Sequence, residues 1–90
     1  MNYYVYILCT SSNTLYIGQT NDLKARLKQH LSKSNKSAKY LKYFPSFTLV
    51  YQEKLSTRQE AMKREWQLKL WSRAKKEALI AGKTTLLKRL

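Results

Sequence analysis

Two short runs of strand-forming residues lie near the start of the chain. Tyr3–Cys9 is rich in aromatic and β-branched residues, and Thr14–Gln19 has the same character. Between them, Thr10–Asn13 consists of small polar residues that are typical of a turn. Strands joined by so short a connection can pair only in the antiparallel sense, so these residues predict a β-hairpin.

The hairpin has a predicted core face and a predicted second face, because side chains alternate along a strand. The core face carries Val5, Ile7, Cys9, Leu15 and Ile17. The second face carries Tyr4, Tyr6, Leu8, Tyr16 and Gly18. With a loop of about three residues, Tyr6 would face Gly18 and Tyr16 would face Leu8, leaving the two phenols diagonal to each other. A glycine at this position leaves space above the strand.

The stretch from Asn21 to about Leu31 has helical periodicity, and its apolar side carries two polar residues. The apolar arc is formed by Leu23, Leu27 and Leu31. His30 lies just inside one edge of this arc and Arg26 just beyond it. The residues that point elsewhere are Lys24, Lys28 and Gln29. Arginine keeps its charge while histidine exchanges a proton, so the pair combines a phosphate ligand with a proton-transfer group.

Two helix starts are marked by capping residues. Thr20 or Asn21 is the expected N-cap of the first helix, with Asp22 in its first turn. Thr57, followed three residues later by Glu60, has the form of a capping box. The box predicts a helix that continues to about residue 71.

The remaining segments complete one domain. Residues 32–46 are expected to form a short helix and a loop, Phe47–Tyr51 a third strand, and Ser72–Ala81 a last amphipathic helix. A chain of 90 residues has room for one modest core. We place this domain at residues 1–81 and expect a helical or frayed tail at 82–90.

The charge is strongly positive. Eighteen lysines and arginines against five acids give a formal net charge of +13. A folded domain with this charge predicts a polyanionic partner, for which nucleic acid, DNA above all, is favoured over an anionic membrane surface. The candidate nucleic-acid contacts are Lys39, Lys42, Lys63, Lys69 and Arg73.

The location follows from what the sequence lacks. Cys9, an expected core residue, is the single cysteine, so no intramolecular disulfide can form and a reducing compartment is favoured. The longest apolar run, Tyr3–Cys9, is far too short for a membrane span of about 20 residues. We therefore expect a cytoplasmic protein.

Several of these residues together resemble the motifs of the GIY-YIG nuclease superfamily, particularly its small single-domain bacterial members. Tyr4-Val5-Tyr6 stands for the first motif, departing from it at the first letter, and Tyr16-Ile17-Gly18 is the second motif intact. Arg26, His30 and Glu65 follow in the family's order and spacing. The resemblance implies an α+β fold in which helices flank a small antiparallel sheet of three strands. It also implies an endonuclease that hydrolyses phosphodiester bonds with a divalent metal ion.

The resemblance also implies roles for the motif residues. Arg26 would contact the scissile phosphate, Glu65 would hold Mg²⁺ or Mn²⁺, and a tyrosine would accept the proton of the attacking water. Tyr6 and Tyr16 are both candidates for this base, with His30 orienting a phenol or relaying the proton. The few acids of the chain favour one metal ion over two. We expect these five side chains to converge on one face of the sheet.

Other interpretations stay open. The chain could be a nucleic-acid-binding or structural module with this fold and little activity, or a subunit that gains specificity from a partner. Arg26 could pair with Asp22, and Glu65 with Lys69, as ordinary pairs four residues apart on a helix. His30 could be a half-buried structural residue. The two tryptophans, Trp66 and Trp71, are expected to pack in the core or at its edge rather than stack on bases.

Overall fold

The computed structural model describes residues 2–32 and 46–82 of the chain. The elements, in sequence order, are β1 (Tyr3–Thr10), β2 (Leu15–Thr20), α1 (Leu23–Ser32), β3 (Phe47–Leu55), α2 (Arg58–Leu70) and α3 (Arg73–Ile80). The strands form one antiparallel sheet in the order β2-β1-β3. The fold is α+β, as predicted.

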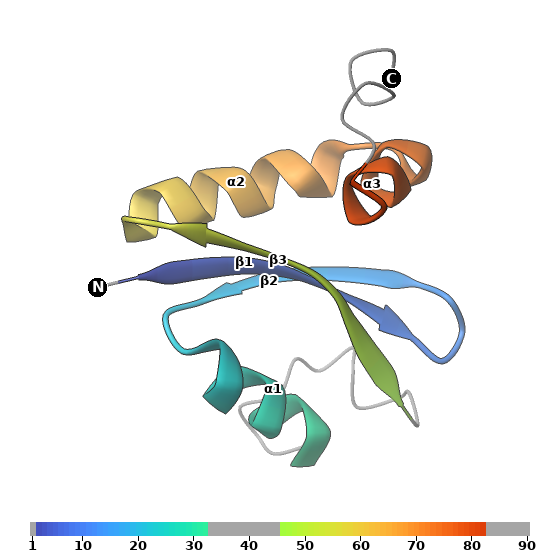
Figure 1. Ribbon diagram of the computed structural model, residues 1–90, viewed down its shortest axis with the longest axis horizontal. Helices are drawn as coiled ribbons and strands as arrows, with labels where there is room; N and C mark the ends of the chain where they lie inside the picture. The colour runs from blue at the N-terminus through green and yellow to red at the C-terminus, as the bar shows by residue number, and fades with distance from the viewer. Residues whose placement is uncertain (1, 33–45, 83–90) are drawn as a thin grey trace.

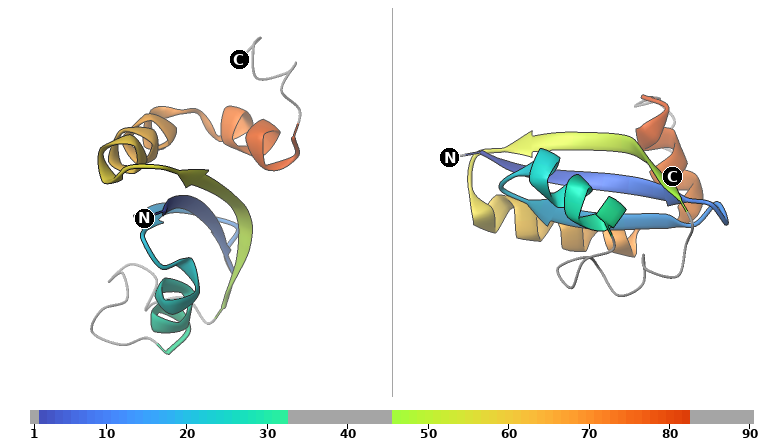
Figure 2. Two further views of the ribbon diagram at one scale, coloured as in Figure 1. Left: turned by 60° about the vertical axis from the view of Figure 1, so that its left-hand side comes forward. Right: turned by 90° about the horizontal axis from the view of Figure 1, so that it is seen from below.

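Helices cover both faces of the sheet (Figures 1 and 2). Helices α2 and α3 lie over one face, and α1 lies over the other. The first face buries Val5, Ile7 and Ile17 against α2, and the second buries Tyr6 and Leu8. This division confirms the predicted alternation, except that Cys9 is half-buried beside the hairpin turn, where its Sγ donates to Asn13 Oδ1 at 3.5 Å. The single core that we expected is instead two apolar clusters, because Leu23 and Leu27 of α1 cover the second face.

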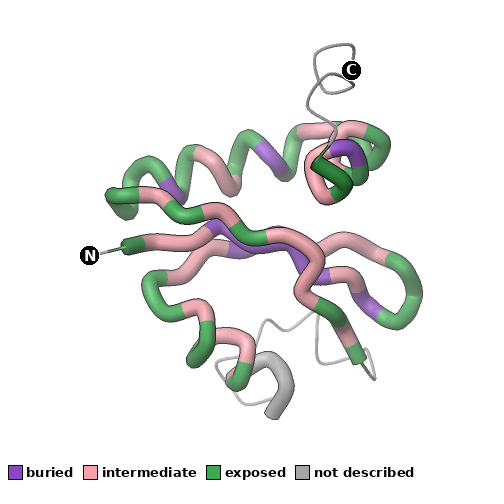
Figure 3. The backbone as a smooth tube through the Cα atoms, viewed as in Figure 1, coloured by how far each residue is buried: buried purple, intermediate pink, exposed green. Residues whose placement is uncertain are grey.

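The central strand β1 contains the most deeply buried part of the sheet (Figure 3). Its register with β2 pairs Tyr6 with Gly18 and Leu8 with Tyr16, as the sequence predicted. The hairpin turn is closed by Asn13, whose backbone φ of 64° is in the left-handed region that asparagine tolerates. The Thr10 side-chain hydroxyl accepts a hydrogen bond of 3.1 Å from the Thr14 N–H. These contacts set the register that places the two tyrosines.

The helix caps agree with the sequence at α2 and differ at α1. Thr57 caps α2 and accepts a hydrogen bond of 3.1 Å from the Glu60 N–H. The Glu60 carboxylate accepts a hydrogen bond from the Ser56 N–H. In a standard capping box it would accept from the N–H of the cap residue, Thr57. At α1, Asp22 rather than Thr20 or Asn21 is the cap, because its carboxylate accepts from Ala25 N–H at 3.1 Å.

Two predicted boundaries change or lie outside the structure. Strand β3 continues to Leu55, four residues beyond the predicted end, because its pairing with β1 extends to the Tyr3–Leu55 pair. The short helix and loop expected for residues 32–46, and most of the tail, lie outside the described residues. Within the described segments, no helix has the length and apolar character needed to cross a membrane.

The Tyr6 ring lies directly across Gly18. A Cβ atom built on Gly18 would lie 2.5 Å from the Tyr6 hydroxyl oxygen and 2.7 Å from Cζ. Real Cβ atoms do not approach other atoms so closely, and Tyr6 is only 1% exposed, so the ring has little room to move away. The glycine of the second motif therefore has a steric role: it lets a tyrosine of β1 reach across β2.

We predict that Gly18→Ala destabilises the protein by about 1–3 kcal/mol through overpacking. Urea unfolding would measure this change. A lower free energy of unfolding would be informative, because alanine is ordinarily favoured over glycine inside a strand by about 0.5–1 kcal/mol. In a Tyr6→Leu background the penalty of the added methyl group should shrink. An unchanged or increased stability of Gly18→Ala would contradict the steric assignment.

Candidate active site at the edge of the sheet

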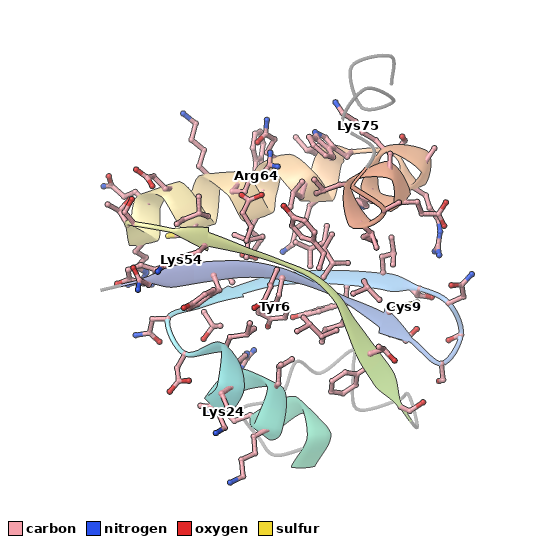
Figure 4. All side chains as sticks on the ribbon, viewed as in Figure 1. Tyr6, Cys9, Lys24, Lys54, Arg64 and Lys75 are labelled. Atoms are coloured by element: carbon pink, nitrogen blue, oxygen red, sulfur yellow. The ribbon has the colours of Figure 1, made fainter. Side chains whose placement is uncertain are left out.

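The two motif tyrosines lie on the α1 side of the sheet. Tyr6 comes from β1 and Tyr16 from β2, and both belong to the apolar cluster under α1. Figure 4 shows Tyr6 between the sheet and α1. Tyr6 is buried, whereas Tyr16 is half-buried. Strand β2 is an edge strand, so the Tyr6 ring, which crosses Gly18, points toward the edge of the sheet.

Arg26 of α1 bonds with the Tyr6 phenol, as the predicted inward position requires. The hydrogen bond from Arg26 stabilises the ionised form of Tyr6. Arg26 also donates from a guanidinium nitrogen to Gln29 Oε1 at 3.2 Å. This bond agrees with helical spacing, since residues three apart on a helix are neighbours. Arg26 uses these partners, while the carboxylate of Asp22 caps the helix.

An open polar pocket adjoins Arg26. It has a volume of about 310 Å³ and lies between the end of β2 and the start of α1. The lining residues are Gln19, Thr20, Asn21, Asp22, Ala25, Arg26 and Gln29. A phosphate group that entered this pocket would meet a guanidinium already bound on one side by a phenol.

Glu65 reaches this region from the opposite layer. It lies on α2, on the side that carries the buried residues Ala61 and Leu68, and its side chain is 20% exposed. Its charge acts on the Tyr6 phenol, and α2 packs against β2. The expectation that all the site residues share one face is wrong for Glu65. The candidate site therefore draws on both layers, with the tyrosines and Arg26 on the α1 side of the sheet and Glu65 on α2.

The environment of Tyr6 opposes ionisation. Burial raises the pKa of its phenol, and the charges of Tyr16 and Glu65 raise it further. The hydrogen bond and positive charge of Arg26 lower the pKa, but their combined effect is smaller. Tyr6 therefore keeps its proton at neutral pH, so its chemistry here is that of a hydrogen-bonding phenol.

Glu65 is the acid whose charge acts on the Tyr6 phenol, and a single carboxylate fits one hard cation. Four of the five acids have other partners: Asp22 caps α1, Glu53 binds Arg64, Glu60 binds Ser56 and Glu77 binds Arg73. Glu65 pairs with Lys69 at 3.2 Å, as one alternative interpretation predicted. In the described part of the chain, no three histidine, cysteine or acidic side chains form a metal-binding group. Mg²⁺ is commonly held by one or two carboxylates, water and substrate phosphates, so Glu65 fits this ligand set.

Several predicted contacts have surface positions or lie outside the described residues. Lys63 is exposed, Lys69 is half-exposed beside Glu65, and Arg73 pairs with Glu77 at 3.1 Å. Lys39 and Lys42 lie outside the described residues. His30 follows Arg26 by one turn of α1, and its side chain is also outside them.

The tryptophans differ from each other. Trp71 packs at the edge of the core, as expected, and its ring is flanked by Arg64 at 5.2 Å and Lys75 at 4.3 Å. Trp66, by contrast, is 66% exposed, so the expectation of core packing is wrong for this residue. It lies on the outer side of α2, away from the buried positions of that helix.

Sequence reasoning missed a charged cluster that fastens α2 to β3. Arg64 donates from Nε to Glu53 at 2.9 Å and from a second nitrogen to the same carboxylate at 3.2 Å. Tyr51 donates its hydroxyl to Glu53 at 2.6 Å. The spacing of Tyr51 and Glu53, two residues apart on one strand, was the available signal that they share a face.

This cluster predicts a pH dependence of stability. Burial, followed by the hydrogen bond to Glu53, raises the pKa of Tyr51 to about 12. In the unfolded chain the pKa of a tyrosine phenol is about 10. The folded state therefore favours the protonated phenol: this stabilisation is complete below about pH 10 and is lost as the pH rises through about 12.

We predict that the free energy of unfolding of wild type falls more steeply above about pH 10 than that of Tyr51→Phe. Urea unfolding of both proteins at a series of pH values measures the difference, which isolates this phenol from lysines that titrate in the same range. Parallel curves for the two proteins would show that Tyr51 does not make this contribution.

Comparison with known proteins places these features in a family. Residues 2–78 match the family described as the GIY-YIG catalytic domain. A UPF0213 protein of Bacillus pumilus is 42% identical over 79 residues, covering 88% of this chain and 79% of that protein. A UPF0213 protein of Staphylococcus haemolyticus is 42% identical over 78 residues, covering 87% of this chain and 93% of that protein.

Solved structures agree with the fold. The solution NMR structure of a UPF0213 protein from Bacillus halodurans has a TM-score of 0.58 and 41% identity, covering 90% of this chain and 84% of that one. A protein from E. faecalis, also solved by NMR, has a TM-score of 0.63 and 29% identity, with coverages of 94% and 88%. The matched motifs, the sheet order and these relatives lead to one conclusion: this chain belongs to the GIY-YIG family.

Proposed function

We propose that the chain is an endonuclease that hydrolyses phosphodiester bonds in nucleic acid, DNA in the first instance, with one Mg²⁺ or Mn²⁺ ion. The observation that carries the proposal is the hydrogen bond between Arg26 and the Tyr6 phenol, with Tyr16 in the same cluster and Glu65 near enough for its charge to act on that phenol. Membership of a nuclease-type family and a net charge of +13 give further support.

Each charged residue has a distinct task in this proposal. Arg26 binds a non-bridging oxygen of the scissile phosphate and offsets the charge that develops there. Glu65 would hold the metal ion, which when bound would stabilise negative charge on the phosphate and the leaving group. Lys69 competes for the Glu65 carboxylate through their ion pair, so binding of the ion would require this pair to loosen.

Tyr6 and Tyr16 have different roles in this proposal. Tyr6 is buried and retains its proton, so we assign it the positioning of Arg26 rather than proton transfer. Tyr16 is half-buried and is therefore the better candidate to take a proton from water. As the water oxygen bonds to phosphorus, Tyr16 takes the water's proton and passes its own to His30. The bond to the leaving oxygen breaks, and this oxygen keeps the bonding electrons and takes a proton from solvent.

A binding module with little activity is the second candidate function. The Glu65–Lys69 pair favours it, because this pair occupies the carboxylate that would hold the metal ion. In a further version of this alternative, a partner supplies the specificity of the chain. A panel of labelled DNA and RNA structures, incubated with and without Mg²⁺, distinguishes the candidates: an enzyme cuts at least one of them, whereas a binding module only retains them.

We predict that Arg26→Ala and Glu65→Gln each lower the cleavage rate by about 10²–10³ while leaving most of the binding intact. Each loses an interaction with the transition state, whereas the overall attraction depends on many charges. Glu77→Gln is the matched control, since Glu77 also pairs with a cation four residues away but lies on α3. Equal cleavage by Glu65→Gln and wild type at limiting Mg²⁺ would refute the metal-ligand role.

We also predict that Tyr16→Phe slows cleavage by about 10²–10⁴ and removes the pH dependence on the alkaline side of the rate profile. Tyr6→Phe should lose less activity and keep the shape of the profile, because only the hydrogen bond to Arg26 is removed. Single-turnover cleavage over a range of pH measures both properties. The opposite pattern, with the larger loss and altered profile in Tyr6→Phe, would exchange the two roles.

A further inference from the structure

The outer side of α2 exposes large apolar side chains that the proposed reaction does not use. Met62, Trp66 and Leu70 are 50%, 66% and 67% exposed. They are spaced four residues apart, so they form one stripe along the helix, turned away from the sheet. A tryptophan this exposed is uncommon in a folded domain and indicates a contact surface.

Trp66 also forms one wall of a shallow pocket. The pocket has a volume of about 390 Å³ and lies between α2 and the end of β3. Its lining residues are Leu55, Glu60, Lys63, Arg64, Trp66 and Gln67. Leu55 and Trp66 offer apolar surface, Lys63 and Arg64 are cations, and Gln67 carries an amide. Glu60 is held by Ser56 through a hydrogen bond of 3.3 Å.

We propose that Trp66 is a stacking platform for an unpaired nucleobase. A base offers a flat π-face to the indole ring, and its phosphate offers a negative charge to Lys63. Its edge can accept a hydrogen bond from the side-chain NH2 of Gln67, whose Oε1 accepts from Arg64 at 2.9 Å. The combination of an exposed aromatic ring with neighbouring cations is how proteins hold single strands without reading their sequence. The stacked base then belongs to a strand, or to a junction, with unpaired nucleotides.

The positive charge of the protein favours a nucleic-acid strand over a second copy of the chain as the occupant of this surface. Two copies that met through this stripe would bring Lys63 and Lys69 of each against cations of the other, in a protein that already carries +13. Three side chains also supply far less than the roughly 800 Å² per partner that stable interfaces bury. A nucleic-acid strand, in contrast, has the opposite charge along its length.

The position of Trp66 connects this platform with the proposed reaction. Trp66 directly follows Glu65 on α2, but their side chains point about 100° apart, so a strand that reached both would have to pass over this helix. This inference rests on the proposed function for that connection and names its substrate class: nucleic acid with unpaired bases near the cut. The stacking itself is independent of cleavage and can be measured without metal.

The first experiment uses the two single-tryptophan variants as matched reporters. Trp71→Phe leaves Trp66 as the fluorophore, and Trp66→Phe leaves Trp71. In EDTA, a short oligothymidylate should quench the emission of Trp71→Phe, and an abasic strand of the same length should not. The emission of Trp66→Phe should change little with either strand. Quenching of Trp66 by both strands alike, or by neither when both bind, would overturn the proposal.

The second experiment measures affinity. Trp66→Ala should weaken binding of the oligothymidylate about 5- to 150-fold and leave binding of the abasic strand and of blunt duplex unchanged. The dependence of affinity on salt should stay as in wild type, because no charge is removed. Met62→Ala, which removes a neighbouring apolar side chain, is the control and should have little effect.

The outcomes distinguish the Trp66 platform from the proposed nuclease function on which it rests. If wild type binds strands and duplex but Trp66→Ala binds all of them equally well, the platform is refuted and the nuclease proposal stands. If wild type binds no nucleic acid at low salt, both are refuted. A concentration-dependent dimer that Trp66→Ala abolishes would assign the stripe to a second copy and overturn the platform.

Discussion

The contact between the Tyr6 ring and the bare backbone of Gly18 is the constraint on which the rest of the site depends. It brings a side chain of the central strand across the edge strand, so that its hydroxyl meets Arg26 of α1. A methyl group at Gly18 would occupy the space of the ring, and a shorter residue at position 6 would leave Arg26 without its phenol partner. One small and one large residue thus determine where the guanidinium lies.

The same burial that holds Tyr6 in place limits its chemistry. A phenol in an apolar cluster is a rigid hydrogen-bonding partner, but burial raises its pKa and removes it from solvent. Tyr16 lies on the edge strand and remains half-buried. Two residues of the same type on neighbouring strands therefore have different capacities, and the difference arises from the strand each occupies rather than from its motif.

The sequence predicted what depends on local periodicity. Alternation along the hairpin placed Tyr6 opposite Gly18, and helical spacing placed Arg26 toward the sheet. Periodicity could not predict features that depend on how the helices pack on the sheet. Glu65 lies across the sheet from α1, and the Glu53–Arg64 pair joins residues eleven apart in sequence. Trp66 was misjudged because hydrophobic character indicates burial only when a partner element covers the residue.

The bond between Arg64 and Glu53 has an effect on its neighbour in sequence. Successive residues of a helix point about 100° apart, so fixing the direction of one side chain fixes the rotation of the helix and hence the direction of the next. Arg64 is held against β3 by Glu53 and lies over the Trp71 ring, which leaves α2 little freedom to roll. The direction of the Glu65 carboxylate is therefore controlled from the opposite edge of the sheet, by an ion pair that bonds with Tyr51 of β3.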